Sequence, residues 1–182
     1  MKVLTPIMEM IESGQALDQF SEPLAKGVRS LTRATPVKNA LSGSWLGHPL
    51  HPMLTDVPIG AWSMATLLDL TGGEDSAAAA KRLVGIGVLS AVPTALAGAS
   101  DWSEVHGPPQ RVGIVHAAAN SLGASLQLAS WLVRAKGHRK TGILLSFAGL
   151  SAVGVGGYLG GHLTYAQGVG VTLEAVESRS GE

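Results

Sequence analysis

Four long apolar segments constrain the fold of this chain more than any other feature. They cover residues 52–70, 77–100, 112–133 and 141–163. Each is close to the roughly 20 residues that an α-helix needs to cross a hydrocarbon core of about 30 Å. Segments that are apolar on every side would leave a soluble bundle without a face for water. The pattern therefore predicts four transmembrane helices.

The loops between these segments are short, at residues 71–76, 101–111 and 134–140. Short connections make neighbouring helices antiparallel. We therefore predict an all-α fold, an up-down bundle of four transmembrane helices that occupies residues 45–172. Residues 173–182 form a polar tail in this scheme.

The composition agrees with a membrane protein and excludes several function classes. Only 14% of the residues are charged, against about 25% in soluble domains. The absence of cysteine excludes disulfides, thiolate-ligated clusters and cysteine nucleophiles. The net charge of zero argues against a nucleic-acid partner, which requires a basic patch. The first thirty residues contain no uninterrupted apolar stretch, so we expect no cleavable signal peptide.

Residues 1–44 differ from the rest and are predicted to form an amphipathic N-terminal arm. Its apolar residues recur at helical spacing and its charged residues are free to face water. Pro23 is predicted to divide this arm into two short helices, with Ser21 as the cap of the second. The arm either lies flat on a bilayer, covers the bundle or stays solvated. The apolar residues are Leu17, Phe20, Leu24, Val28 and Leu31, and the charged ones Asp18, Glu22, Lys26, Arg29 and Arg33.

Basic residues at the loops predict the orientation. They gather at the first and third loops, which the positive-inside rule places in the cytoplasm with both termini outside. The basic residues of the arm argue in the opposite direction. The basic residues that flank or occupy these two loops are Lys81, Arg82, Arg134, Lys136, Arg139 and Lys140.

Two histidines precede the first apolar segment. His48 and His51 are each followed by a proline, and Pro52 suits the first position of a helix, where its missing N–H has no partner in any case. We therefore predict a helix that begins at Pro52, with His48 and His51 just outside it and Asp56 one turn inside.

The predicted topology brings five of the six histidines to one membrane face. His138 alone lies at the opposite face. Polar residues of the third segment recur at helical spacing and must face the bundle interior, because lipid cannot satisfy them. The clustered histidines are His48, His51, His106, His116 and His162, accompanied by Asp56, Asp101, Glu104 and Arg111. The interior stripe comprises His116, Asn120, Gly123, Gln127 and Arg134.

Several chemistries suit this cluster. Imidazole is the axial ligand of b-type haem, and two histidines from different helices would clamp one: His116 and His162, or one of these with His51. Arg111 would then pair with the propionates. His48 and Asp56 would support the ligands or handle protons.

A metal ion is the alternative. His48, His51, His116, His162 and Asp56 provide the nitrogen and oxygen ligands that zinc or copper accepts. A proton or quinone site is a third reading, and a hydrogen-bond network that joins the helix ends is a fourth. No nucleotide loop or nucleophile elbow is present, so the sequence favours a protein that is not an enzyme by itself.

Three motifs carry a resemblance to a known family. They are Gly47-His48-Pro49-Leu50-His51-Pro52, Asp56-Val57-Pro58-Ile59-Gly60 and Gly160-Gly161-His162-Leu163-Thr164-Tyr165. Over residues 44–172 the chain resembles bacterial membrane proteins catalogued as domain of unknown function 2231. The resemblance implies a four-helix inner-membrane protein without an established activity. It marks His48, His51 and His162 as motif positions and assigns them no role.

Some members of that family are joined to, or encoded beside, Rieske-type iron–sulfur domains, which implies a redox setting. This chain lacks cysteine, so such a partner would be a separate protein. We therefore expect a multi-pass protein of the bacterial inner membrane that transfers electrons through haem b, with the histidine cluster on the extracytoplasmic side. The alternatives are a non-haem metal-binding or transport-linked protein and a structural subunit without cofactor. Expected partners are the lipid bilayer and a redox protein, with a homo-oligomer as a further option and no nucleic acid.

Overall fold

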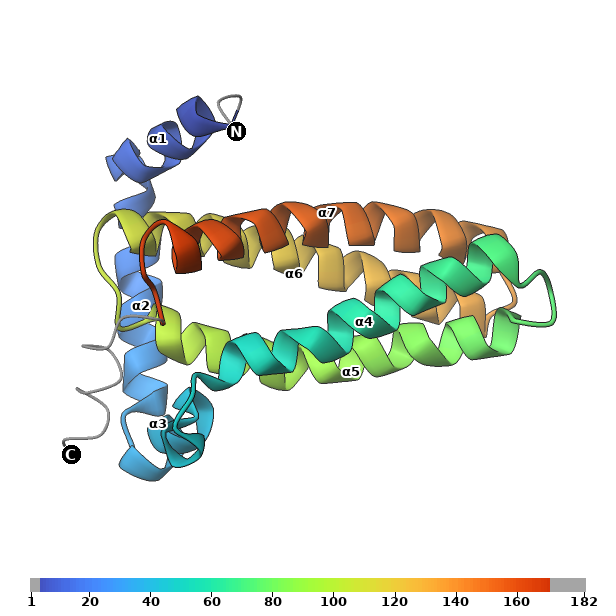
Figure 1. Cartoon of the computed structure of the whole chain (residues 1–182), viewed down its shortest axis with the longest axis horizontal. Coiled ribbons are helices and arrows are strands. Elements are labelled where there is room, and N and C mark those ends of the chain that lie inside the picture. The colour runs from blue at the N-terminus through green and yellow to red at the C-terminus, as the bar shows by residue number, and fades with distance from the viewer. Residues whose placement is uncertain (1–3, 171–182) are drawn as a thin grey trace. The chain divides into compact units, whose positions relative to one another are not determined.

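A computed structural model describes residues 4–170, which are helical with no strand (Figure 1). This confirms the all-α prediction for the described part of the chain, while the polar tail expected at 173–182 lies outside it. Seven α-helices and two short 3₁₀ helices occur there. They are α1 (Thr5–Ser13), η1 (Gln15–Leu17), α2 (Asp18–Thr32), α3 (Thr35–Ser42), η2 (Ser44–Leu46), α4 (Leu50–Thr71), α5 (Ala77–Trp102), α6 (Pro108–Ala135) and α7 (Arg139–Tyr165).

The described residues divide into two compact units. The first unit contains residues 4–51, 95–117 and 157–170, and the second contains residues 52–94 and 118–156. The helices α4, α5, α6 and α7 each contribute residues to both units. All but one of the histidines belong to the first unit, and the exception is His138.

The four apolar segments coincide with α4, α5, α6 and α7, whose ends lie within a few residues of the predicted ones. The predicted start of the first segment is wrong, because α4 begins at Leu50 and includes His51 in its first turn. Backbone N–H groups of a first turn have no partner inside the helix. Pro52 therefore fits as the third residue of α4 without the loss of a hydrogen bond.

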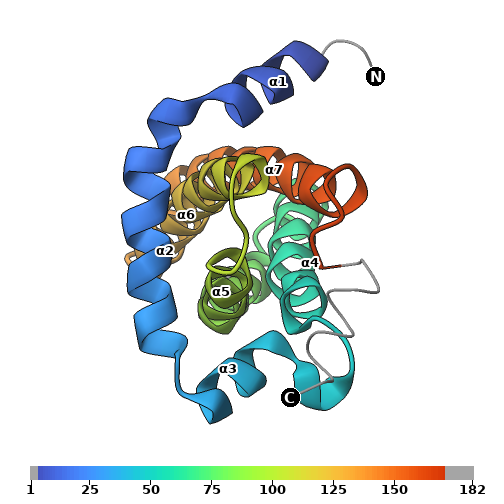
Figure 2. The same cartoon turned by 90° about the vertical axis from the view of Figure 1, so that its left-hand side faces the viewer.

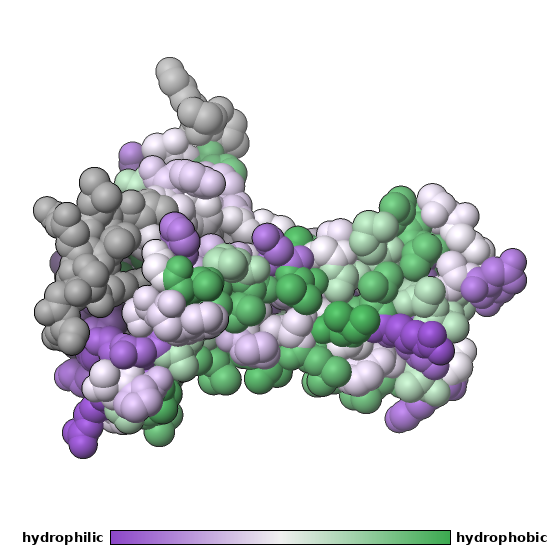
Figure 3. Space-filling model, turned by 60° about the horizontal axis from the view of Figure 1, so that its bottom comes forward, coloured by the Kyte–Doolittle hydropathy of each residue, from purple (hydrophilic) through white to green (hydrophobic). Residues whose placement is uncertain are grey.

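Within residues 4–170, only α5 and α7 are long and apolar enough to cross a membrane, so the prediction of four spans is corrected to two candidates. Polar residues explain the difference, because they lower the mean hydropathy of a helix whichever side they face. Asp56 and Asp69 lie on α4, and Asn120, Gln127 and Arg134 lie on α6. Large apolar side chains are nevertheless exposed along the long helices, as the hydrophobic surface in Figure 3 shows.

The predicted division of the arm at Pro23 is also wrong, because α2 continues through this proline. Ser21 caps no helix. It is buried, and its hydroxyl lies 3.5 Å from Oε1 of Gln110. A proline removes one backbone donor, and contacts on both sides of Pro23 offset that loss. Asp18 binds Arg111, and Arg29 donates to the carbonyl of Ser103.

Each unit has its own packing. In the first unit the buried side chains of Met8, Val112 and Leu159 bring α1, α6 and α7 together. In the second unit the buried Trp62 donates its indole N–H to the carbonyl of Val84 at 3.3 Å, which joins α4 to α5.

Candidate histidine site

The imidazole rings of His51 and His116 contact each other edge to face within the first unit. Their ring centroids lie 6.2 Å apart and their planes meet at 82°. His51 comes from the first turn of α4, and His116 from the third turn of α6. Both side chains are partly buried. Two of the histidines predicted to meet are thus brought together.

Two glycines make room for these rings. A Cβ atom on Gly98 would lie 2.7 Å from Cε1 and Nδ1 of His51, and a Cβ atom on Gly160 would lie 3.0 Å from Cε1 of His116. The first distance is shorter than any normal carbon contact, so a larger residue at 98 would displace the ring. Gly98 belongs to α5 and Gly160 to α7. All four long helices therefore contribute one residue each to the site.

His162 has a different partner from the one the haem hypothesis requires. Its Nε2 lies 2.6 Å from Oε1 of Glu12, and Gln167 donates a hydrogen bond of 2.8 Å to the same oxygen. Glu12 belongs to α1 in the arm. The sequence analysis missed Glu12, because nothing in a separation of 150 residues indicates that this carboxylate meets His162.

Arg111 is held by the arm as well. Its Nε and Nη2 donate to the two carboxylate oxygens of Asp18 at 2.7 and 2.6 Å, and its Nη1 donates to the carbonyl of Glu12 at 2.7 Å. The hydrogen bonds from Arg111, together with its charge, hold the pKa of Asp18 below its ordinary value against the opposing effect of burial. The role of Arg111 as a propionate partner stays a prediction.

The other residues of the predicted cluster are more dispersed. His48 is exposed and Asp56 lies in the second unit, while His106 contacts Nη1 of Arg29 at 3.4 Å. Between residues 4 and 170, no three or more His, Asp or Glu side chains are grouped so that they could share a metal ion. The zinc or copper site at His48, His51, Asp56, His116 and His162 stays a prediction without a preassembled set of ligands.

The second unit contains a polar network that the sequence analysis identified in part. Gln127 and Arg134, expected to face the interior, are both buried. The amide of Gln127 donates to the carbonyl of Ser146 at 3.1 Å and accepts from the Ser146 hydroxyl at 2.9 Å. Arg134 donates to both carboxylate oxygens of Asp69 at 3.0 and 2.5 Å. Asp69 was not singled out, although it lies one residue before the end of the first apolar segment, at the membrane face predicted for the basic third loop.

The histidine pair and the motif positions lie within a region that matches a known family. The family model for predicted membrane proteins of unknown function, DUF2231, matches residues 47–173. The chain belongs to this family. Searches of curated proteins and of solved structures returned no match. Membership confirms the resemblance and the membrane nature of the chain. The family description assigns no activity to its members.

The DUF2231 match begins after the arm, so it includes His51, His116 and His162 but not Glu12 or Asp18. The contacts of His162 and Arg111 thus tie residues of the family region to residues outside it. The association with Rieske-type proteins stays a prediction.

Proposed function

We propose that this membrane protein is an electron-transfer module that binds one b-type haem between His51 and His116. The observation that carries the proposal is the separation of 6.2 Å between the two ring centroids. Two imidazole nitrogens that each bind a shared metal at about 2 Å leave their ring centres roughly 6 Å apart. The spacing of the pair therefore suits two axial ligands of one iron.

The number of gathered ligands favours haem over a bare ion. A protein site for zinc needs three or four ligands from side chains, whereas a haem brings its own equatorial nitrogens and needs two axial residues at most. In the part of the chain that the structure describes, two imidazoles meet and no larger group of ligands does. This count suits a porphyrin better than zinc or copper.

The protein would hold and orient the ligands while the haem supplies one-electron chemistry when bound. Gly98 and Gly160 leave space for the two imidazoles, so the rings are positioned by helices that carry no ligand themselves. His162 and Arg111 are engaged with the arm. His162 would then fix the arm rather than ligate iron, and Arg111 would fix the arm beside its predicted role at the propionates. A separate redox protein would exchange electrons with the site.

The test is an absorption spectrum of detergent-purified protein, oxidised and then reduced with dithionite, with haem supplied during expression. We expect a Soret band and a reduced α-band that are both lost in His51→Ala and in His116→Ala. His138→Ala is the matched control, since His138 lies in the second unit. A featureless visible spectrum would overturn the proposal, and elemental analysis of the same sample would then separate an ion site from a protein without cofactor.

The location belongs to the same proposal: the bacterial inner membrane, with the histidine pair towards the extracytoplasmic side. The basic third loop, with Lys136 and Arg139, supports this orientation. Because the chain lacks cysteine, Gly137→Cys and Gly107→Cys each introduce a single thiol. A membrane-impermeant maleimide applied to intact spheroplasts should label the thiol at 107 and not the one at 137. The reverse labelling would invert the orientation.

A further inference from the structure

Helix α2 presents three distinct sides, each made of residues separated by four and then seven positions. Residues with this spacing lie on one side of an α-helix, and consecutive residues are turned by about 100°. The apolar and the charged side therefore flank the packing side in opposite directions. The apolar side is Phe20, Leu24 and Leu31, the packing side Ser21, Ala25 and Thr32, and the charged side Glu22 and Lys26, continued by Arg33 directly after the end of α2.

The packing side holds α2 on the first unit by polar groups rather than by its large apolar residues. Ser21 and Ala25 are fully buried. Asp18 and Arg29, at the edge of this side, bind Arg111 and the carbonyl of Ser103. Ser103 follows the end of α5 and Arg111 lies at the start of α6, and Figure 2 shows α2 running beside both.

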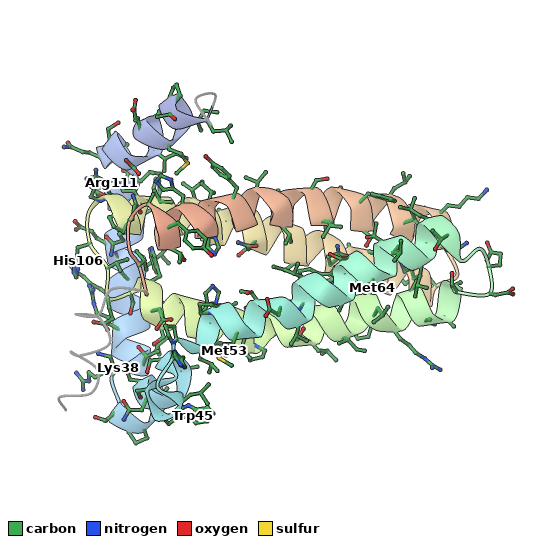
Figure 4. The ribbon with its side chains drawn as sticks, in the orientation of Figure 1. Lys38, Trp45, Met53, Met64, His106 and Arg111 are labelled. Atoms are coloured by element: carbon green, nitrogen blue, oxygen red, sulfur yellow. The ribbon has the colours of Figure 1, made fainter. Side chains whose placement is uncertain are left out.

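The apolar side of α2 is exposed, which reverses the usual arrangement of a surface helix. Phe20 is 58%, Leu24 56% and Leu31 81% exposed. Trp45, which follows α3, is exposed as well and is labelled in Figure 4. Tryptophan, with its apolar rings and polar N–H, is enriched where membranes meet water. A row of large exposed apolar residues, with such an aromatic exposed further along the chain, indicates a surface that something apolar covers.

The charge of this region indicates what covers it. From the start of α2, residues 18–46 contain four basic residues and two acidic ones, Asp18 and Glu22, and Asp18 is paired with Arg111. A hollow between α2 and α3 is lined by Arg29, Arg33 and Lys38, with Ser30, Thr32 and Glu104 beside them. Basic residues near a bilayer are attracted by anionic headgroups. The same charge opposes a second copy of this chain, because two basic surfaces repel each other.

We propose that α2 lies in the headgroup region of an anionic bilayer, with Phe20, Leu24 and Leu31 in contact with acyl chains. The end of α5 supports this position, since α5 is a candidate membrane span and α2 is attached where it ends. A helix that lies flat in the interface needs one apolar side towards lipid and a basic polar side towards water. The three sides of α2 meet this requirement and leave the third for packing on the protein.

The chain has no cysteine, which permits a test by single spin labels on the full protein. Leu24→Cys and Lys26→Cys are matched variants, because both side chains are exposed and lie on opposite flanks of α2. Each is labelled with a nitroxide and reconstituted into vesicles of phosphatidylglycerol and phosphatidylcholine. We expect the label at 24 to collide with oxygen several-fold more often than with a water-soluble nickel chelate. The label at 26 should show the reverse preference.

Three results would overturn the proposal. Equal accessibility of both labels to the nickel chelate would place the arm in water. Spin–spin broadening at position 24 that disappears on dilution with unlabelled protein would assign the apolar side to a second copy. An unchanged oxygen preference in pure phosphatidylcholine would contradict the proposal that anionic headgroups hold α2 at the bilayer surface. Leu31→Cys, on the same side as Leu24, should repeat its behaviour, and circular dichroism is the control for whether each variant keeps its helices.

Discussion

Each of the two units contains an arginine–aspartate pair joined by two parallel hydrogen bonds, and the pairs differ in how much water reaches them. In the second unit the side chains of Arg134 and Asp69 are 2% and 1% exposed. In the first unit those of Arg111 and Asp18 are 14% and 29% exposed. Breaking a buried pair leaves an uncompensated charge, whereas water replaces the lost partner of an exposed one. The same hydrogen-bond geometry should therefore contribute more to stability in the second unit, where the pair is buried, than in the first, where it is partly exposed.

The glycines differ between the units in a parallel way. In the second unit, Gly85 and Gly87 face the indole rings of Trp131 and Trp62. In the first unit, Gly98 and Gly160 face imidazole rings. The second unit therefore uses close helix approach to pack large apolar rings, and the first unit uses it both for an indole, where Gly113 faces Trp102, and for the two imidazoles. The described glycines that face imidazole rings lie in the first unit.

Asp69→Asn should have the largest effect, because it leaves the buried Arg134 without its charged partner. Loss of one member of a buried pair costs about 3–5 kcal/mol. We expect a clearly lower melting temperature of the detergent-solubilised protein, measured by circular dichroism, than for Asp18→Asn. Equal losses in the two variants would show that burial is not what distinguishes the pairs.

The double variant Asp69→Leu/Arg134→Met is the control for this result. It removes both charges of the pair and replaces them with apolar side chains of similar volume, which is often neutral or stabilising. Arg139, whose Nη2 lies 3.5 Å from Asp69, keeps its partner Glu74. We expect it to recover most of the melting temperature that Asp69→Asn loses. A double variant as unstable as the single one would assign the loss to packing around Asp69 instead.

Gly85→Ala and Gly98→Ala compare a glycine that faces an indole ring with one that faces an imidazole ring. The new Cβ atom would lie 2.6 Å from Cε2 of Trp131 in the first case and 2.7 Å from the His51 ring in the second. Overpacking against a large ring costs roughly 1–3 kcal/mol, so Gly85→Ala should lower the melting temperature. Gly98→Ala should instead shift the Soret band or lower the haem content, since a displaced imidazole alters ligation. An unchanged spectrum in haem-loaded Gly98→Ala would argue against His51 as a ligand.

These contrasts also show what sequence reasoning reaches in this protein. The apolar runs and short loops predicted the four long helices, and helical spacing predicted that Gln127 and Arg134 face inwards. The number of spans was overestimated because polar residues within the apolar runs of α4 and α6 lower the mean hydropathy of these helices. Partners across the fold were beyond reach, since Asp18 and Arg111 are 93 residues apart and Asp69 and Arg134 are 65 apart. No local pattern links such residues until the helices pack.

The pH dependence of stability tests the partly exposed pair of Arg111 and Asp18. Arg111 lowers the pKa of Asp18 from its ordinary value of 3.8, so the carboxylate binds its proton less readily in the folded state. The stabilisation is complete above the ordinary value and is lost as pH falls through the lowered one. The melting temperature of the native protein should therefore exceed that of Asp18→Asn by a constant margin from neutral pH to about pH 5. The margin should shrink only in stronger acid, and a margin that persists there would assign the effect to packing.

The smallest effects are expected at two surface ion pairs, one in each unit. Lys38 and Glu104 are 3.6 Å apart with side chains 49% and 48% exposed, and Glu74 binds Arg139 with its own side chain 86% exposed. Exposed pairs contribute at most about 1 kcal/mol and are screened by salt. Glu104→Gln and Glu74→Gln should therefore barely change the melting temperature.

Glu104→Gln differs in one respect, because it removes the acidic residue from the basic hollow beside α2. In anionic vesicles, Glu104→Gln should move the spin label at position 24 deeper into the bilayer, while Glu74→Gln should leave the depth of that label unchanged. Equal label depth in the two variants would show that the hollow takes no part in holding the arm on lipid.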